Sequence, residues 1–294
     1  MMWRDKDMPL FGRRKKIAYG FYLTAVALLL LFWRFPGDSA RDFAQRAVKR
    51  LHPQLGAGIG RVGLVFPPGV NFRDVAWSYN KEPITRTDYI RLRPGLWSLF
   101  GSSSVCYIKA GAYGGVISGK CRITKDREAE ADLQAGNLTL ENVDWLRRLT
   151  THRFSGRMNG TLKAKFEKDD VQAESHLVFS DITVTLAAPV LDFQSLRLSV
   201  VDADVSATRR RMEIKACTVK GPEIEGEFSG DILVRQPYQM SVLNLKGFLR
   251  PQASFLKQAG KTLPIDLLMK KEQGGKGIPV KLTGTIQSPQ FGFQ

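Results

Sequence analysis

Two glycine-rich stretches have residue types and spacings that come close to those of phosphate-binding sites. Residues 58–63 (GIGRVG) match the GxGxxG fingerprint, which requires a strand before it and a helix after it. Here a helical pattern precedes the stretch and the extended LVFPP segment follows, so the required order is reversed. Residues 114–121 (GGVISGKC) nearly match a P-loop, but Cys121 occupies the place of the magnesium-binding hydroxyl. Neither stretch predicts a nucleotide site.

The other side chains capable of chemistry are scattered along the chain. His52, His152 and His176 have no Cys or carboxylate partners at metal-ligand spacing, and no Ser lies in a GxSxG turn. Asp74 and Asp181 are interpreted as turn formers. We therefore predict no catalytic residues, no metal site and no cofactor, and we expect that the protein is not an enzyme.

Three cysteines occur, and two of them flank a predicted hairpin. Cys106 and Cys121 enclose a segment that is expected to turn near Tyr113-Gly114, so the two cysteines would face each other. In an oxidising compartment they could form a disulfide, with Cys217 left over. The alternative is that both are small apolar strand residues.

Alternation of apolar and polar residues with a period of two runs through the chain from residue 59 onward. It is clearest in residues 128–135, 162–167, 182–186, 212–216 and 278–282. This pattern predicts strands with one face in water, as in antiparallel sheets. The Ser-Gly or Thr-Gly pairs at 118–119, 155–156, 229–230 and 283–284 are expected to be bulges or bends. Short helices are expected at 140–149 and 255–271, and the second could cover a sheet edge.

An uncharged apolar segment near the N-terminus predicts a membrane anchor. Residues 17–33 are long enough to cross a bilayer and carry aromatic side chains at both ends. The expected anchor residues include Ile17, Tyr19, Phe21, Leu28, Leu31 and Trp33. The preceding basic residues, which orient the chain with its N-terminus in the cytoplasm, are Arg13, Arg14, Lys15 and Lys16. We favour an uncleaved anchor over a cleaved signal peptide, because the Asp38-Ser39-Ala40 site is a poor one.

Residues after the anchor form a predicted amphipathic helix that ends at Pro53. Its apolar face includes Phe43, Ala44 and Val48, and its other face is basic. Two positions for this helix remain open, on a lipid surface or packed on the first sheet. The expected organisation is therefore a cytoplasmic N-terminus (1–16), an inner-membrane anchor (17–35), an amphipathic helix (36–53) and a periplasmic β-rich domain (54–294).

The formal net charge is +16, from 44 basic and 28 acidic residues. The basic residues mostly alternate with apolar ones, and no nucleic-acid-binding motif accompanies them. The charge therefore indicates an anionic membrane as a partner rather than nucleic acid.

Several segments occur in the order of a known family. They are GRVGLVFPPGVNFRDVAW, YIRLRPGLWSLFG, AYGGVISGKCRI, FSGRMNGTLKAKF, LKGFLRP and GIPVKLTGTIQSPQF. In this order the chain resembles the type II secretion system protein N (GspN) family. Its layout also looks like that of AsmA-type proteins, which implies a mainly β protein with an extended, curved antiparallel sheet and a few short helices.

The resemblance implies a non-enzymatic inner-membrane component of the type II secretion system. Its expected partners are proteins of the inner-membrane platform or the outer-membrane secretin, together with membrane lipids. The alternative is an AsmA-like module that binds or transfers lipid between the inner and outer membranes. An apolar surface left open to solvent would favour lipid, and one closed against a second sheet would favour a scaffold. The residues expected on that surface are Leu162, Phe166, Phe179, Ile182, Val184, Leu198, Ile214 and Phe228.

Overall fold

A computed structural model of the protein describes most of the chain after residue 35. The described residues are 15, 17–23, 26, 30, 36–51, 53–66, 69–95, 103–124, 128–149, 152–167, 170–190, 193–252, 255 and 277–293. Within this part of the chain, no helix combines the length and apolarity needed to span a membrane. Residues 17–23 are helical. Of the expected anchor, the other described residues are 26 and 30, and the rest of it lies outside the described residues. Of the basic residues before the anchor, Lys15 is described and the other three are not. The helix expected at 255–271 lies outside the described residues except for Phe255.

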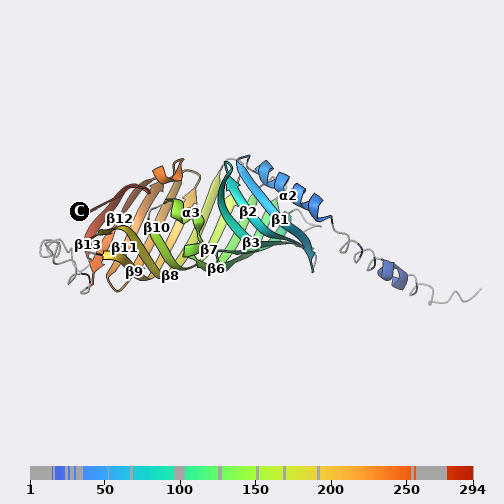
Figure 1. The fold of residues 1–294 in the computed structure, drawn as a ribbon, viewed down its shortest axis with the longest axis horizontal. Helices are drawn as coiled ribbons and strands as arrows, with labels where there is room; N and C mark the ends of the chain where they lie inside the picture. The colour runs from blue at the N-terminus through green and yellow to red at the C-terminus, as the bar shows by residue number, and fades with distance from the viewer. Residues whose placement is uncertain are drawn as a thin grey trace, which may run out of the picture.

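One antiparallel sheet of 14 strands contains almost all of the described chain beyond residue 54. Each strand pairs with the next in sequence, so the spatial order is β1 to β14 without a crossover (Figure 1). The strands are β1 (Leu55–Val65), β2 (Gly69–Tyr79), β3 (Glu82–Pro94), β4 (Ser103–Ala112), β5 (Gly115–Thr124), β6 (Ala129–Thr139), β7 (Arg153–Phe166), β8 (Val171–Val190), β9 (Phe193–Thr208), β10 (Arg211–Lys220), β11 (Ile224–Leu233), β12 (Val242–Pro251), β13 (Ile278–Thr285) and β14 (Pro289–Phe293). The prediction of a mainly β, antiparallel protein is confirmed.

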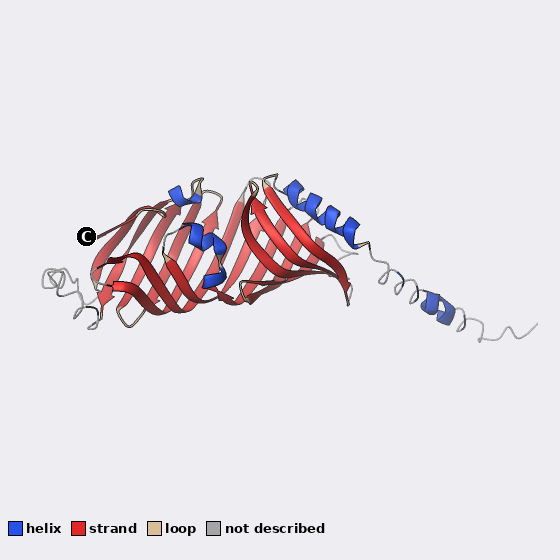
Figure 2. Cartoon of the chain, viewed as in Figure 1, coloured by secondary structure: helices blue, strands red, loops and turns tan. Residues whose placement is uncertain are grey.

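Helices are few and short beside this sheet (Figure 2). In the part of the chain described from residue 36 onward, they are α2 (Gly37–Leu51), η2 (Leu140–Asn142), α3 (Asp144–Leu149) and η3 (Tyr238–Met240). The interruption expected at 140–149 is confirmed as η2 and α3. The sheet itself curls along its length into an elongated trough, with α2 at one end and the C-terminal strands at the other.

Tight turns connect neighbouring strands where the sequence allows a positive φ. Tyr113 and Gly114 have φ of 54° and 75°, and Asn80 and Lys81 have φ of 50° and 69°. Two consecutive left-handed residues match the twist of antiparallel strands, which explains these two-residue hairpins. The hairpin predicted at Tyr113-Gly114 is confirmed.

Glycines also produce bends inside strands. Gly156, Gly230 and Gly284 of the Ser-Gly and Thr-Gly pairs have φ of 132°, 140° and 87°, a region that other residues rarely adopt. At Gly119 a Cβ atom would overlap the backbone of β6. Asp74 and Asp181 have φ of 55° and 53° within β2 and β8, so they form bends inside strands and not turns between them.

Helix α2 packs on the first strands of the sheet. Its Ala44 and Val48 lie against a buried cluster of Ala57, Ile59 and Val75. Of the two positions that the sequence left open, the structure shows the helix packed on the sheet. Phe43 of the same apolar face remains 66% exposed.

Candidate functional site

One face of the sheet is apolar across every strand. The strand register joins single residues of successive strands into a transverse row, and a row from β1 to β13 contains no polar residue. Its members are Val62, Phe72, Ile90, Ala110, Ile117, Ala135, Gly160, Leu177, Ala203, Cys217, Phe228, Gly247 and Val280. Because side chains alternate between the faces of a strand, the residues two positions away lie on the same face.

Three further rows extend this apolar face. The first contains one polar residue, Ser175, and consists of Leu64, Val70, Leu92, Ile108, Gly119, Leu133, Leu162, Ser175, Val205, Ile214, Gly230, Leu245, Leu282 and Phe291. The second is Pro94, Cys106, Cys121, Ala131, Ala164, Ala173, Ala207, Met212, Ile232, Leu243, Gly284 and Pro289. The third is Leu138, Met158, Phe179, Val201, Val219, Gly226, Leu249 and Ile278. These four rows together are called the inner face.

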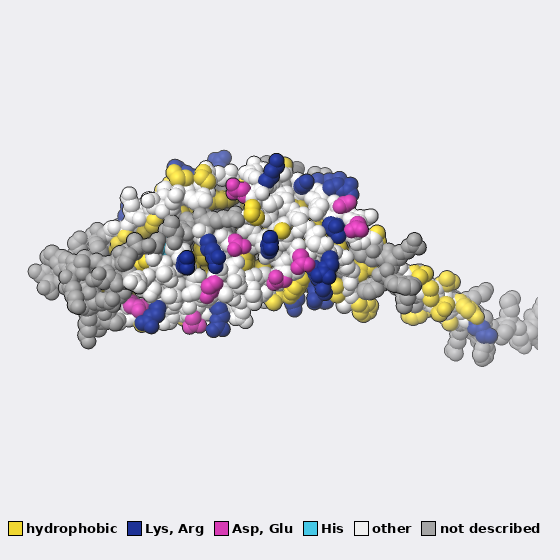
Figure 3. All heavy atoms as spheres, viewed as in Figure 1, with side chains coloured by type: hydrophobic (Ala, Val, Ile, Leu, Met, Phe, Trp, Pro, Cys, Tyr) yellow, Lys and Arg dark blue, Asp and Glu magenta, His cyan; other side chains and the backbone are white. Residues whose placement is uncertain are grey.

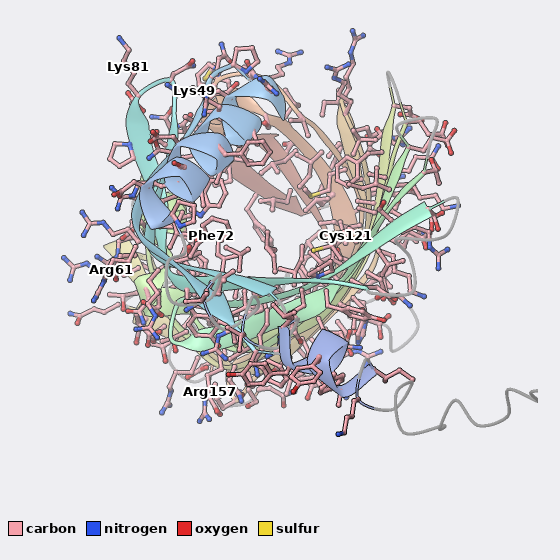
Figure 4. The ribbon with its side chains drawn as sticks, turned by 90° about the vertical axis from the view of Figure 1, so that its right-hand side faces the viewer. Lys49, Arg61, Phe72, Lys81, Cys121 and Arg157 are labelled. Atoms are coloured by element: carbon pink, nitrogen blue, oxygen red, sulfur yellow. The ribbon has the colours of Figure 1, made fainter. Side chains whose placement is uncertain are left out.

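The opposite face, called the outer or polar face, is polar in the same regular way. One row consists of Arg93, Tyr107, Lys120, Asp132, Lys163, Glu174, Ser206, Glu213, Asp231, Asn244, Thr283 and Gln290. Figure 4 looks along the long axis and shows Phe72 and Cys121 pointing into the trough, whereas Arg61, Lys81 and Arg157 point away from it. The concave side of the trough is therefore the apolar one.

No second sheet packs against the inner face in the described part of the chain. Most inner-face side chains are half-buried, including Phe72, Leu162, Leu177 and Phe228. In a sandwich, the middle of such a face would be close-packed and almost fully excluded from solvent. The inner face is thus an apolar surface that solvent still reaches in part.

Six of the eight residues expected on one apolar surface can be placed on or near this face. Leu162, Phe179, Ile214 and Phe228 belong to the inner-face rows. Ile182 is buried and Phe166, at the rim beside Ala129, is 44% exposed. The sequence identified these residues by alternation but could not show that they join into continuous rows.

Cys106 and Cys121 are directly opposite each other on β4 and β5, as predicted. Both thiols are free and half-buried on the inner face, as is Cys217 in another row. Burial raises the pKa of all three thiols above the ordinary value, and the proximity of Cys106 contributes at Cys121. A raised pKa lowers the thiolate fraction, so these groups are poor nucleophiles at neutral pH.

Strand pairing gives His176 carboxylate neighbours that its spacing along the sequence does not reveal. Its Nδ1 lies 2.9 Å from Oδ1 of Asp204 and 3.5 Å from Oδ1 of Asp202, on the polar face. The hydrogen bond to Asp204 raises the pKa of His176. Strand pairing brings together residues 28 positions apart, which a search for ligand spacing along the sequence misses. Among the described residues, no cluster of three or more His, Cys, Asp or Glu side chains is arranged to hold a metal ion.

The glycine-rich stretches do not form phosphate loops. Residues 58–63 lie within β1, and 114–121 form a turn and the first part of β5. No strand–loop–helix arrangement exists at either place, which agrees with their interpretation from the sequence.

Comparisons with known proteins found no matching family model, no similar curated protein and no similar solved structure.

Proposed function

We propose that the protein binds lipid acyl chains along the inner face of its sheet. The observation that carries this proposal is the continuity of the apolar rows across the sheet, which no second sheet covers in the described chain. With neighbouring strands about 4.8 Å apart, 14 strands give a path on the order of 60 Å along the sheet. That path is about twice the thickness of a bilayer's hydrocarbon core, so it has room for acyl chains placed end to end.

Burial of the chains provides the driving force. Each methylene removed from water contributes about 0.8 kcal/mol, so ten methylenes contribute on the order of 8 kcal/mol before the cost of association. The half-buried inner side chains would lose their remaining contact with water at the same time. This mode of binding needs no catalytic group and no cofactor.

The test is to purify the full chain in a mild detergent and to extract and identify bound lipid by mass spectrometry. We expect phospholipid at a fixed ratio to protein, and a loss of that lipid when a charge is placed on the inner face. A chain that is free of lipid, and that does not take up a fluorescent fatty acid or phospholipid, would contradict the proposal.

We also propose the membrane topology expected from the sequence, in which an anchor lies in the inner membrane and the β-rich part lies in the periplasm. Such a protein would be an AsmA-like module that carries lipid between the two membranes. A reporter fused after Phe35 should be active only in the periplasm.

A GspN-like role in type II secretion is the second candidate. It is supported by the resemblance of the sequence to the GspN family and by β14, which lies at the edge of the sheet and pairs with β13 alone among the described strands. An unpaired strand can pair with a strand of a partner protein. A photo-crosslinking residue at Gln290 should then capture a platform protein or the secretin in cells, whereas a control at the outward-facing Thr161 should not.

A further inference from the structure

The outer face carries a cleft of about 440 Å³ over β3 to β6. Four cationic side chains line it, Arg91, Arg93, Lys109 and Lys120, together with Tyr107 and one carboxylate, Asp132. We call this group the basic cleft. It lies on the polar face, and the surface seen in Figure 3 shows Lys and Arg gathered at the end of the sheet that carries α2. Residues 36–112 hold 11 basic and 5 acidic residues, so this part of the chain contributes +6 of the net charge.

Strand pairing places the positive charges of the basic cleft next to one another. Arg91 is directly opposite Lys109, and Arg93 is opposite Tyr107, which in turn is opposite Lys120. Like charges that face each other across two antiparallel strands repel and destabilise the sheet. An anion bound between them would remove this repulsion.

Most of these cations have no acidic partner. Lys120 lies 3.7 Å from Asp132, whereas in the described chain no ion pair to a carboxylate involves Arg91, Arg93 or Lys109. The Nε of Arg91 is buried and has no hydrogen-bond acceptor. Its guanidinium lies 4.9 Å from the centroid of the Tyr89 ring, and this contact restrains the side chain. The cleft therefore contains a restrained donor that lacks an acceptor.

A neighbouring cleft shows that this is a local feature. It has a volume of about 540 Å³ and is lined by Lys120, Arg122, Lys163 and Lys165, with the three carboxylates Glu130, Asp132 and Glu174. There, Arg122 and Lys165 lie 3.7 Å and 3.8 Å from Glu130. The sheet thus nearly balances its charges in one cleft, with four cations and three carboxylates, and leaves them unbalanced in the basic cleft, with four cations and one carboxylate.

We propose that the basic cleft binds a phosphate group. Guanidinium groups donate paired hydrogen bonds to phosphate oxygens, ammonium groups supply compact positive charge, and the Tyr107 hydroxyl can donate a further bond. The phosphate can belong to an anionic lipid headgroup or to a soluble phosphate compound. This site is on the face opposite the acyl-binding surface, so it does not depend on the proposed function.

The experiment titrates the full chain, in a non-ionic detergent, with three probes at fixed ionic strength. The probes are pyrophosphate, dihexanoyl phosphatidic acid and dihexanoyl phosphatidylcholine, and the readouts are calorimetric binding and the unfolding temperature. The test variant is Arg91→Gln with Lys109→Gln. The matched control is Lys163→Gln with Lys165→Gln, which removes the same charge from the nearly balanced cleft.

We expect phosphatidic acid to bind the wild type and the control, and to bind the test variant at least about tenfold more weakly, as expected for loss of charge-assisted hydrogen bonds. Without ligand the test variant should unfold at the same temperature as the wild type or a higher one, because the repulsion is gone. Binding of pyrophosphate as well would identify the phosphate itself as sufficient, and binding of phosphatidic acid alone would identify the lipid headgroup as the source. Equal losses in both variants, a loss of phosphatidylcholine binding in the test variant as large as that of phosphatidic acid, or no binding of either pyrophosphate or phosphatidic acid by the wild type would overturn the proposal.

Discussion

A charge placed at Leu162 separates an open apolar surface from a closed core. Leu162 lies on β7 in the middle of the sheet, is half-buried, and belongs to an inner-face row between Leu133 and Ser175. Full burial of a leucine side chain is worth about 1.5–3 kcal/mol, so Leu162→Asp should lower the free energy of unfolding by only about 1–2 kcal/mol if water still reaches the new carboxylate. In a closed core the same unpaired charge would cost several kcal/mol more.

The same substitution should reduce lipid binding much more than stability. An acyl chain that avoids the carboxylate loses contact for about three methylenes, roughly 2 kcal/mol, which weakens binding by about 30-fold. The control is Thr161→Asp, which adds the same charge to the exposed outer face one residue away. Bound lipid is measured by mass spectrometry, and stability by chemical denaturation in the same detergent.

Two results would refute this reasoning. If Leu162→Asp fails to fold while Thr161→Asp folds normally, the inner face is a closed core. If both variants retain the same amount of lipid, the inner face is not the binding surface.

The other predictions concern strand bends and titrating groups. Gly156→Ala should destabilise the protein by about 1–3 kcal/mol in denaturant unfolding, because φ is 132° and the new Cβ would lie 2.9 Å from a carbonyl oxygen of β8. The control, Gly63→Ala, should have little effect, because no atom lies within 4 Å of its new Cβ. Mild oxidation should link Cys106 to Cys121 and stabilise the fold by about 3 kcal/mol. Alkylation of the free thiols should be slow at pH 7 and accelerate toward alkaline pH, because burial raises their pKa. Fast alkylation at neutral pH would contradict this expectation. The pKa of His176 is raised in the folded chain. Protonated His176 should therefore stabilise the fold at pH values below its pKa in the unfolded chain, and this stabilisation should be lost as the pH rises through its pKa in the folded chain. A proton NMR titration that gives His176 an ordinary or lowered pKa would refute the hydrogen bond to Asp204.

The alternation of apolar and polar residues along the chain is sufficient by itself to determine the fold class. Residues 162–167 and 212–216 show the pattern and lie largely in β7 and in β10. The hairpin at Tyr113-Gly114 and the opposition of Cys106 and Cys121 were also predictable, because a two-residue turn fixes the register of the strands on either side. These are local properties, which depend on backbone conformation over a few residues.

The tertiary structure decided how the strands combine. A one-residue change of register moves every side chain to the other face, and the bends at Gly156 and Asp181 depend on contacts between strands. The sequence could therefore neither join Leu162 to Leu133 in one row nor place Asp204 beside His176. Likewise, Arg91 and Lys109 are 18 residues apart in sequence, and only the pairing of β3 with β4 makes them face each other. Whether an apolar face is covered depends on elements distant in sequence, since burial is a property of the packed molecule and not of any single strand.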